Sequence, residues 1–169
     1  MYNQLIELSE KRKSIRKFSD KKVNEELLDK ILEMIKLSPT AGNLEDFKVT
    51  VVKSREIRGA LQEVTFVDDA PVVLIFSALP EVSAKYYGER GETLYSIQDA
   101  TIACTYAMLA VEALGLVTTW VGNFDLNEVK EIIGAEEKEI PVAILPIGYA
   151  PMELETKEKE KKLPEIKYL

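Results

Sequence analysis

The segment LYSIQDATIACTYAMLAVEALGLVTTWVGNF, residues 94–124, joins an apolar helical pattern to a β-branched one. In its centre, residues 102–114 carry only two clearly polar side chains, contain no Pro and show no alternation with a period of two. This pattern predicts a helix over 94–114 that is buried on several sides, because it is apolar almost all round. Gly115 is suited to end that helix, and VTTWVG, residues 117–122, predicts a buried strand.

A membrane-spanning helix is the alternative interpretation of this segment, since residues 100–122 are long enough to cross a bilayer. Glu112 in the middle, Gly115 after it and the lack of a Lys or Arg cluster on either side disfavour that alternative. A buried core helix is therefore preferred.

The composition is typical of a globular protein, with 46% hydrophobic and 30% charged residues in a chain of 169. This length predicts one domain, residues 1–169, with a substantial core. The net charge of −7 disfavours nucleic-acid binding, because a phosphate backbone requires a basic face. The N-terminus lacks an apolar signal segment, so we expect a cytoplasmic protein that does not bind membranes.

The usual catalytic side-chain arrangements are missing from the sequence. There is no His and only one Cys, so neither a Ser-His-Asp nor a Cys-His pair can form, and no CxxC, HExxH, Walker or GxGxxG motif occurs. We therefore expect no metal site and no catalytic side chain, and a bound cofactor would perform the difficult step of any reaction. Cys104 lies in the apolar helix and is expected to be a packed thiol.

Helices and strands are predicted in mixed order along the rest of the chain. Without regular βαβ alternation, this order predicts an α+β fold. The expected helices cover 3–12, about 25–36 after the N-cap Asn24, 54–64 after Ser54, and 125–133 with Asp125 and Glu128 as a capping pair. The expected strands are 47–53, 71–78 and 141–149, and residues 80–92 form a helical or mobile excursion.

The C-terminal extension, residues 152–169, changes composition abruptly. It begins with the charged run ELETKEKEKK, which cannot form a core alone, and a solvated linker is its default interpretation. Ile166, Tyr168 and Leu169 follow, and they indicate a tail that docks on another surface, such as a second subunit.

RKSIRKF, residues 12–18, is the first candidate binding segment. Arg12, Lys13 and Arg16 place three cations within five residues, with the hydroxyl of Ser14 among them. Guanidinium groups pair with phosphate oxygens in a bidentate way, so this cluster suits a phosphate monoester. The alternative is a solvated basic surface.

SPTAGN, residues 38–43, is the second candidate. Pro39, Ala41 and Gly42 expose backbone, and the amide of Asn43 can donate and accept hydrogen bonds at once. This suits the edge of a planar heterocycle, and the alternative is a simple helix stop and turn.

Taken together, the motifs resemble the FMN-dependent nitroreductase family over nearly the whole chain. RKSIRKF, SPTAGNLEDFKVTVV, QDATIACTYAMLAVEALGL, TTWVGNF and PVAILPIGYAP before a basic tail occur in the order and spacing of that family. The resemblance implies an α+β sandwich with a central, mainly antiparallel sheet flanked by helices. It also implies an intertwined homodimer in which a C-terminal strand crosses to the partner, with residues 152–169 docking there and an FMN site at each interface.

The resemblance also assigns cofactor contacts to specific residues. Arg12, Lys13 and Ser14 would hold the FMN phosphate and ribityl chain, and Arg16 would lie near the N1–C2 carbonyl side and favour the anionic reduced flavin. The ring and chain would be contacted by Pro39, Thr40, Ala41 and Asn43 of the other subunit. The backbone of Gly122 and Asn123 after Trp120 would face N5 and O4. Pro146, Ile147 and Gly148 would line the site, and Lys161 or Lys162 would complete the phosphate clamp.

The implied activity is hydride transfer from NADH or NADPH through flavin N5 to a nitroaromatic, quinone or flavin acceptor, in a ping-pong scheme. Two departures from the family pattern concern the site: Glu45, Asp46 and Phe47 stand where Gln-Pro-Trp is usual, and Lys replaces Arg near the tail.

The sequence is also compatible with other functions. One is a specialised reductive enzyme of the same fold, such as a dehalogenase of the iodotyrosine type, in which Lys85, Tyr86 and Tyr87 would close over an aromatic substrate. Another is a non-catalytic FMN carrier or sensor. The simplest alternative is a core domain with accidental basic loops, which predicts a colourless monomer.

Overall fold

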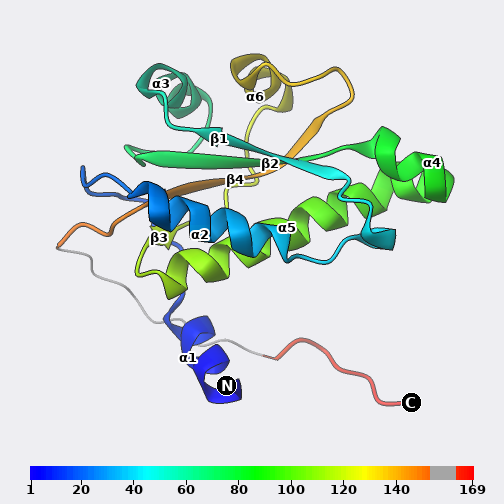
Figure 1. Ribbon diagram of the computed structural model, residues 1–169, viewed down its shortest axis with the longest axis horizontal. Coiled ribbons are helices and arrows are strands. Elements are labelled where there is room, and N and C mark those ends of the chain that lie inside the picture. Colours follow the sequence, from blue (N-terminus) through cyan, green and yellow to red (C-terminus); the bar gives the residue numbers. More distant parts are fainter. Residues whose placement is uncertain (153–162) are drawn as a thin grey trace.

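A four-stranded antiparallel sheet forms the middle layer of the computed structural model, which describes residues 1–152 and 163–169 (Figure 1). The strand order is β1-β2-β4-β3, and each neighbouring pair is antiparallel. The strands are β1 (Phe47–Val52), β2 (Val72–Ala78), β3 (Val117–Thr118) and β4 (Ile140–Gly148). The predicted α+β class and the antiparallel sheet are therefore confirmed.

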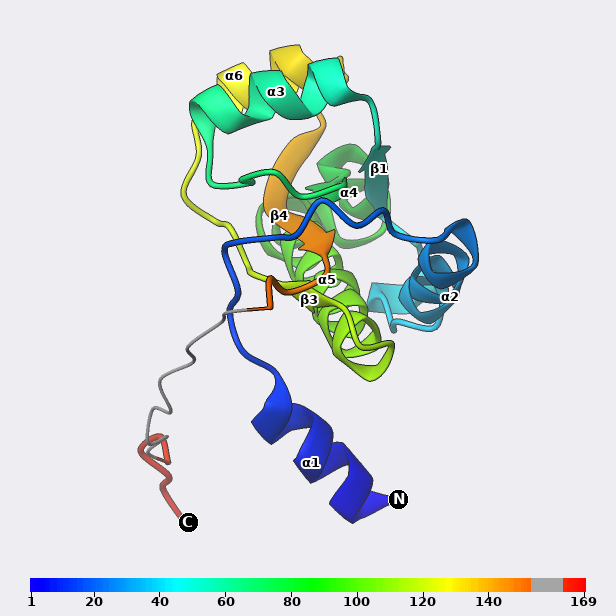
Figure 2. The same cartoon turned by 90° about the vertical axis from the view of Figure 1, so that its left-hand side faces the viewer.

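Helices cover both faces of the sheet (Figures 1 and 2). One face packs against α2 (Glu25–Lys36) and α5 (Ser96–Ala113), and the other against α3 (Arg55–Val64) and α6 (Leu126–Ile133). Beyond one end of the sheet lies α4 (Pro80–Arg90), while α1 (Tyr2–Lys11) stands away from the three layers (Figure 2).

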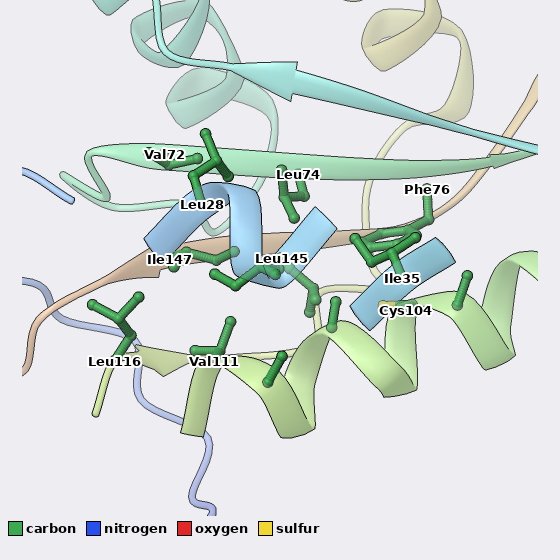
Figure 3. Close-up of a cluster of buried hydrophobic side chains, with 14 of the residues drawn as sticks. Leu28, Ile35, Val72, Leu74, Phe76, Cys104, Val111, Leu116, Leu145 and Ile147 are labelled. Atoms are coloured by element: carbon green, nitrogen blue, oxygen red, sulfur yellow. The ribbon is translucent and has the colours of Figure 1, made fainter. Parts of the chain in front are cut away.

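The core between the sheet and the α2–α5 layer explains why β2 is apolar at every position. Val72, Leu74 and Phe76 point toward α2 and α5, whereas Val73 and Ile75 point toward α3 and α6. Alternate side chains of a strand face opposite sides, so a strand covered on both sides must be apolar throughout. Figure 3 shows the first set packed against side chains of both helices and of β4.

The central helix forms close to its predicted position. It spans Ser96–Ala113, ends before Gly115 with φ of 72°, and is preceded by a short π-helix, Gly91–Tyr95. Cys104 is fully buried, and burial raises the pKa of its thiol well above the usual range, as expected for a packed thiol.

Three predicted N-caps are confirmed by their hydrogen bonds. The side chain of Asn24 accepts from the N–H of Glu26, that of Ser54 from Ile57, and that of Asp125 from residues 127 and 128. The segment 80–92 is helical, and Gly88, with φ of 56°, interrupts the helical backbone within α4, three residues before the π-helix.

The strand predicted over 117–122 is wrong in its length. Only Val117–Thr118 pairs continuously with β4, and a single bridge joins Val121 to Ile144 farther along. Thr119 and Trp120 interrupt the pairing, although Val117, Thr118 and Val121 face β4 in one register.

The exposed surface includes apolar residues near both ends of the chain. Leu5 and Ile6 of α1 are 51% and 39% exposed, and α1 has no fully buried residue although it contacts α5. Ile166, Tyr168 and Leu169 are also exposed. Within the described part of the chain, no helix combines the length and the hydropathy needed to cross a bilayer.

Candidate functional site

The basic segment 12–18 lies against β3. The N–H of Ile15 donates to the carbonyl of Thr118 at 3.0 Å, and Ser14 forms a parallel bridge with the same residue. Thr118 in turn pairs with Ile147 of β4. Three segments that the sequence assigns to one site therefore meet at one end of the sheet.

The end of β4 holds this arrangement through close backbone contacts. The hydroxyl of Thr118 donates to the carbonyl of Pro146 at 2.7 Å, and the N–H of Ser19 donates to the carbonyl of Tyr149 at 2.9 Å. A Cβ on Gly148 would lie 2.9 Å from Cδ of Pro71 and 3.0 Å from a ring carbon of Phe18, so this close packing favours glycine.

The side chain of Ile147 belongs to the hydrophobic core, and Pro146 and Gly148 are also buried. These three residues therefore form the buried end of β4, against which the basic segment packs. They offer little surface to a ligand.

Arg12 carries a buried donor that no described group satisfies. Its backbone N–H ends α1 by donating to Leu8, and its Nη1 atom is buried without a hydrogen-bond partner among the described residues. A buried polar group without a partner is costly, so this atom fits a site for an anion. Burial raises the pKa of Glu112 on α5, while the charges of Arg12 and Lys11 act in the opposite direction, which places Arg12 near the C-terminal end of α5.

The other basic residues of the segment differ in exposure. Lys13 is half-buried, whereas Ser14 and Arg16 are exposed and accessible to a ligand. Lys161 and Lys162 lie outside the residues that the structure describes, so the second half of the predicted phosphate clamp remains a prediction.

The loop 39–46 has an unusual backbone. Gly42, Asn43 and Glu45 all have positive φ, between 52° and 59°, a conformation that only Gly adopts without strain. The N–H of Ala41 donates to Oδ2 of Asp99 on α5 at 2.6 Å. On the other side, a Cβ on Gly42 would clash with the hydroxyl of Tyr87 of α4. The loop is thus held by α5 and α4.

The two candidate binding segments lie at opposite ends of α5. Ala41 is bonded to Asp99, near the start of the helix, and Arg12 lies by Glu112, near its end. Thirteen residues of helix separate these two points, a distance of roughly 20 Å. Figure 1 shows the same separation, with the loop after α2 beside α4 and the segment after α1 beside β3. One chain therefore does not bring the two segments together.

Residues 120–123 pass along the free edge of β4. Val121 exchanges two backbone hydrogen bonds of 3.0 Å with Ile144, and Trp120 is half-buried against the core. Gly122 and Asn123 are exposed, and a Cβ on Gly122 would lie 3.2 Å from Nε1 of Trp120. Their backbone is therefore accessible to a ligand.

Aromatic residues surround the loop 39–46 at the α4 end. The rings of Tyr87 and Tyr95 meet edge to face, with centroids 5.2 Å apart. Arg90 stacks on Tyr95 and donates from Nε to its hydroxyl at 3.1 Å. Lys85 and Tyr86, which would close over an aromatic substrate in the dehalogenase alternative, are exposed on the same helix.

Asp46, at the end of this loop, and Asp99 of α5 are both buried, and neither was proposed as a site residue from the sequence. The sequence could have indicated a special role for Asp99, because it is an acidic residue within a predicted helix of small and apolar residues. Asp46 gave a weaker signal, as a replacement for the usual Pro. Among the residues that the structure describes, no group of three or more His, Cys, Asp or Glu side chains could hold a metal ion.

Comparison with known proteins agrees with this geometry. The model of the nitroreductase family matches residues 10–66 and 60–149. A Methanothermobacter thermautotrophicus protein, described as a candidate NADH dehydrogenase/NAD(P)H nitroreductase, is 31% identical over 156 residues, covering 86% of this chain and 76% of that protein. The FMN reductase (NAD(P)H) of Bacillus subtilis is 28% identical over 164 residues, covering 87% of this chain and 66% of its own length.

Solved structures show the same fold. The FMN-dependent nitroreductase of Clostridium difficile R20291 superimposes with a TM-score of 0.74 at 26% identity, covering 92% of this chain and 91% of that one. The chain therefore belongs to the nitroreductase family of oxidoreductases, and the prediction made from its motifs is confirmed.

Proposed function

We propose that this protein is an FMN-dependent oxidoreductase that takes hydride from NADH or NADPH and passes electrons to a nitroaromatic, quinone or flavin acceptor. The single observation that carries the proposal is the combination of an anion-accepting segment and a loop suited to a heterocycle in a chain of the nitroreductase family. FMN has a phosphate at one end and a planar ring at the other, so its site needs both an anion-binding segment and a loop that contacts the ring.

The phosphate end fits the segment 12–16. Arg12 offers a buried guanidinium N–H without a protein partner, and the exposed hydroxyl of Ser14 follows it. Arginine binds phosphate in a bidentate way, and a phosphate would satisfy the buried donor. Lys13 and, from the C-terminal extension, Lys161 or Lys162 would add positive charge.

The ring end requires a second copy of the chain. The loop 39–43 lies roughly 20 Å along α5 from Arg12, so one subunit cannot supply both ends of a compact site. In a homodimer with two antiparallel α5 helices, the loop of one subunit would reach the basic segment of the other. The exposed apolar residues of α1 and of 163–169 support such a dimer, in which the extension 152–169 of each one-domain chain docks on its partner.

Each protein group would then have a limited task. When bound, FMN supplies the chemistry, accepting hydride from reduced nicotinamide and giving electrons to the second substrate in turn at one site. Arg16 would place positive charge near the ring and favour its reduced anionic state. The accessible backbone at Gly122 and Asn123 would orient the ring, and the half-buried Trp120 would shield its edge.

The acceptor that fits best is a planar aromatic compound. Tyr87 and Tyr95 stand beside the loop 39–46 with Arg90 next to them, and Tyr86 is 69% exposed on the same helix. Such a cluster offers stacking surfaces together with a cation.

The visible spectrum of the purified protein tests the proposal. We expect a yellow protein, or one that becomes yellow with added FMN, that is bleached by NADH or NADPH without oxygen and sediments as a dimer. Addition of a quinone or nitroaromatic should restore the colour. A colourless protein that fails to bind added FMN would contradict the proposal.

A further inference from the structure

Asp46, the last residue of the loop 39–46, and Asp99 of α5 form a buried acidic pair. Asp46 is fully buried at the start of β1, and Asp99 of α5 is 4% exposed. Asp46 is among the groups that raise the pKa of Asp99, so the two carboxyl groups lie near each other. Asp99 also accepts the Ala41 N–H, and the carbonyl of Asp46 accepts the N–H of Leu79 at 2.9 Å. The pair therefore joins the loop to α5 and to the start of α4.

Two ionised carboxylates would be costly in this position. If both were charged, each oxygen of Asp46 would be a buried acceptor without a donor among the described residues. A single proton between the two groups reduces both costs, because it cancels one charge and supplies a donor to one of the two Asp46 oxygens. Burial, and then Asp46, raise the pKa of Asp99 to about 6, although the Ala41 N–H acts in the opposite direction.

No basic side chain in the described part of the chain is among the groups that shift the pKa of Asp99. The effects on Asp99 come from burial, from Ala41 and from Asp46, and none comes from a Lys or Arg. On the loop itself, Glu45 is exposed, and Tyr87 of α4 contacts Gly42. Lys48 of β1 is exposed and its Nζ binds Glu139, and Glu112 is half-buried at the other end of α5. Exposed charged side chains on the other packed elements include Glu33 and Lys36 of α2, Glu81, Lys85, Glu89 and Arg90 of α4, and Glu92 of the π-helix.

We propose that Asp99 is a positioning residue, which holds residues 40–46 through the Ala41 N–H and through a proton shared with Asp46. The loop needs such support, because Asn43 and Glu45 are non-glycine residues in the left-handed region. As this loop contacts the flavin in the proposed function, the functional part of the inference rests on that proposal. The shared proton itself does not.

The amide resonance of Ala41 reports on the pair directly. In the full-length labelled protein, we expect its chemical shift to follow pH with a midpoint near 6. Asp99→Asn should abolish this titration, because a carboxamide accepts from Ala41 and donates to Asp46 at every pH. Asp46→Asn should move the midpoint down, since it replaces a negative charge by a donor. Asp29→Asn, an exposed acid of α2, should leave the midpoint unchanged.

Three results would overturn the shared proton. They are a midpoint near the ordinary value for Asp in the unmodified chain, a titration that persists in Asp99→Asn, or a midpoint that does not move in Asp46→Asn.

FMN affinity tests the positioning role separately. At pH 5, Asp99→Ala should weaken FMN about tenfold, which is the loss expected for one charged hydrogen bond, whereas Asp99→Asn should retain the affinity. Between pH 5 and 8, the unmodified protein should lose affinity relative to Asp99→Asn, with Asp29→Asn following the unmodified protein. Ionisation of the FMN phosphate is common to all variants and cancels in these ratios.

The two failures are distinguishable. If the unmodified protein bound no FMN, the proposed function would be wrong, and the Ala41 titration would still decide whether the proton is shared. If FMN bound with equal affinity in Asp99→Ala and Asp99→Asn at every pH, the positioning role would be wrong and the proposed function would stand.

Discussion

The N–H of Ile15 donates to the carbonyl of Thr118 at 3.0 Å, and this bond makes the basic segment a neighbour of β3. Thr118 is 2% exposed, and its hydroxyl donates to the carbonyl of Pro146. A short strand of two residues therefore connects the segment that carries Arg12 to the end of β4.

Thr118→Val should weaken this connection. The substitution keeps the shape but removes the donor to Pro146, so we expect the free energy of unfolding in urea to fall by about 1–2 kcal/mol. Thr105→Val is the matched control, because Thr105 is exposed and bonds only to its own helix. Its effect should stay within about 0.5 kcal/mol. Equal effects of the two substitutions would show that the Thr118 bond does not stabilise the fold.

Arg12→Ala should reduce the selectivity for a phosphate ester. We expect FMN affinity to fall at least about tenfold while riboflavin affinity changes little, because the guanidinium would contact only the phosphate. Flavin fluorescence titrations with both ligands give the ratio of FMN affinity to riboflavin affinity. Arg55→Ala, an exposed arginine of α3, should leave both affinities unchanged. Equal loss of FMN and riboflavin binding in Arg12→Ala would mean that Arg12 does not bind the phosphate.

Gly42→Ala should destabilise the loop 39–46. Its φ of 59° disfavours alanine, and the new Cβ would clash with the hydroxyl of Tyr87, so we expect a loss of about 1–3 kcal/mol. Adding Tyr87→Phe should recover part of this loss by removing the clashing oxygen. Gly59→Ala in α3 is the opposite control, since nothing lies within 4 Å of its added Cβ, and it should stabilise by about 0.5–1 kcal/mol. A double variant no more stable than Gly42→Ala would exclude the Tyr87 clash.

The ion pair between Lys48 and Glu139 predicts a dependence of stability on acid. Burial raises the pKa of Glu139, but hydrogen bonds from Lys48 and the Glu136 N–H act in the opposite direction, and its pKa is lowered overall. A lowered folded-state pKa stabilises the protein above the unfolded value and is lost as pH falls through the folded value. We therefore expect the free energy of unfolding to fall below about pH 4.5, measured by denaturant titration at several pH values.

Lys48→Met should expose the cost of burying Glu139, whose side chain is 1% exposed. Removing the cation leaves a buried charge without its partner, so we expect a loss of about 2 kcal/mol at neutral pH that becomes smaller in acid. Lys53→Met removes a cation from an exposed pair with Glu25 and should cost less than about 0.5 kcal/mol. Equal losses of unfolding free energy in Lys48→Met and Lys53→Met would contradict a special cost of burying Glu139.

Local signals in the sequence determined much of the fold. The apolar helical pattern predicted α5, Gly115 its end, and Asn24, Ser54 and Asp125 the starts of three other helices. These features depend on periodicity and on hydrogen bonds between near neighbours, which a sequence contains directly. The order of the motifs also identified the family, because it extends over nearly the whole chain.

The tertiary structure alone decided which segments meet. It shortened the strand after Gly115 to two residues, paired it with Ser14, and placed Ala41 and Arg12 at opposite ends of α5. It also brought together Asp46 and Asp99, which are 53 positions apart in the chain. Contacts of this kind depend on how the layers pack and on the free energy of burying charge, and no local pattern of residues records either of them.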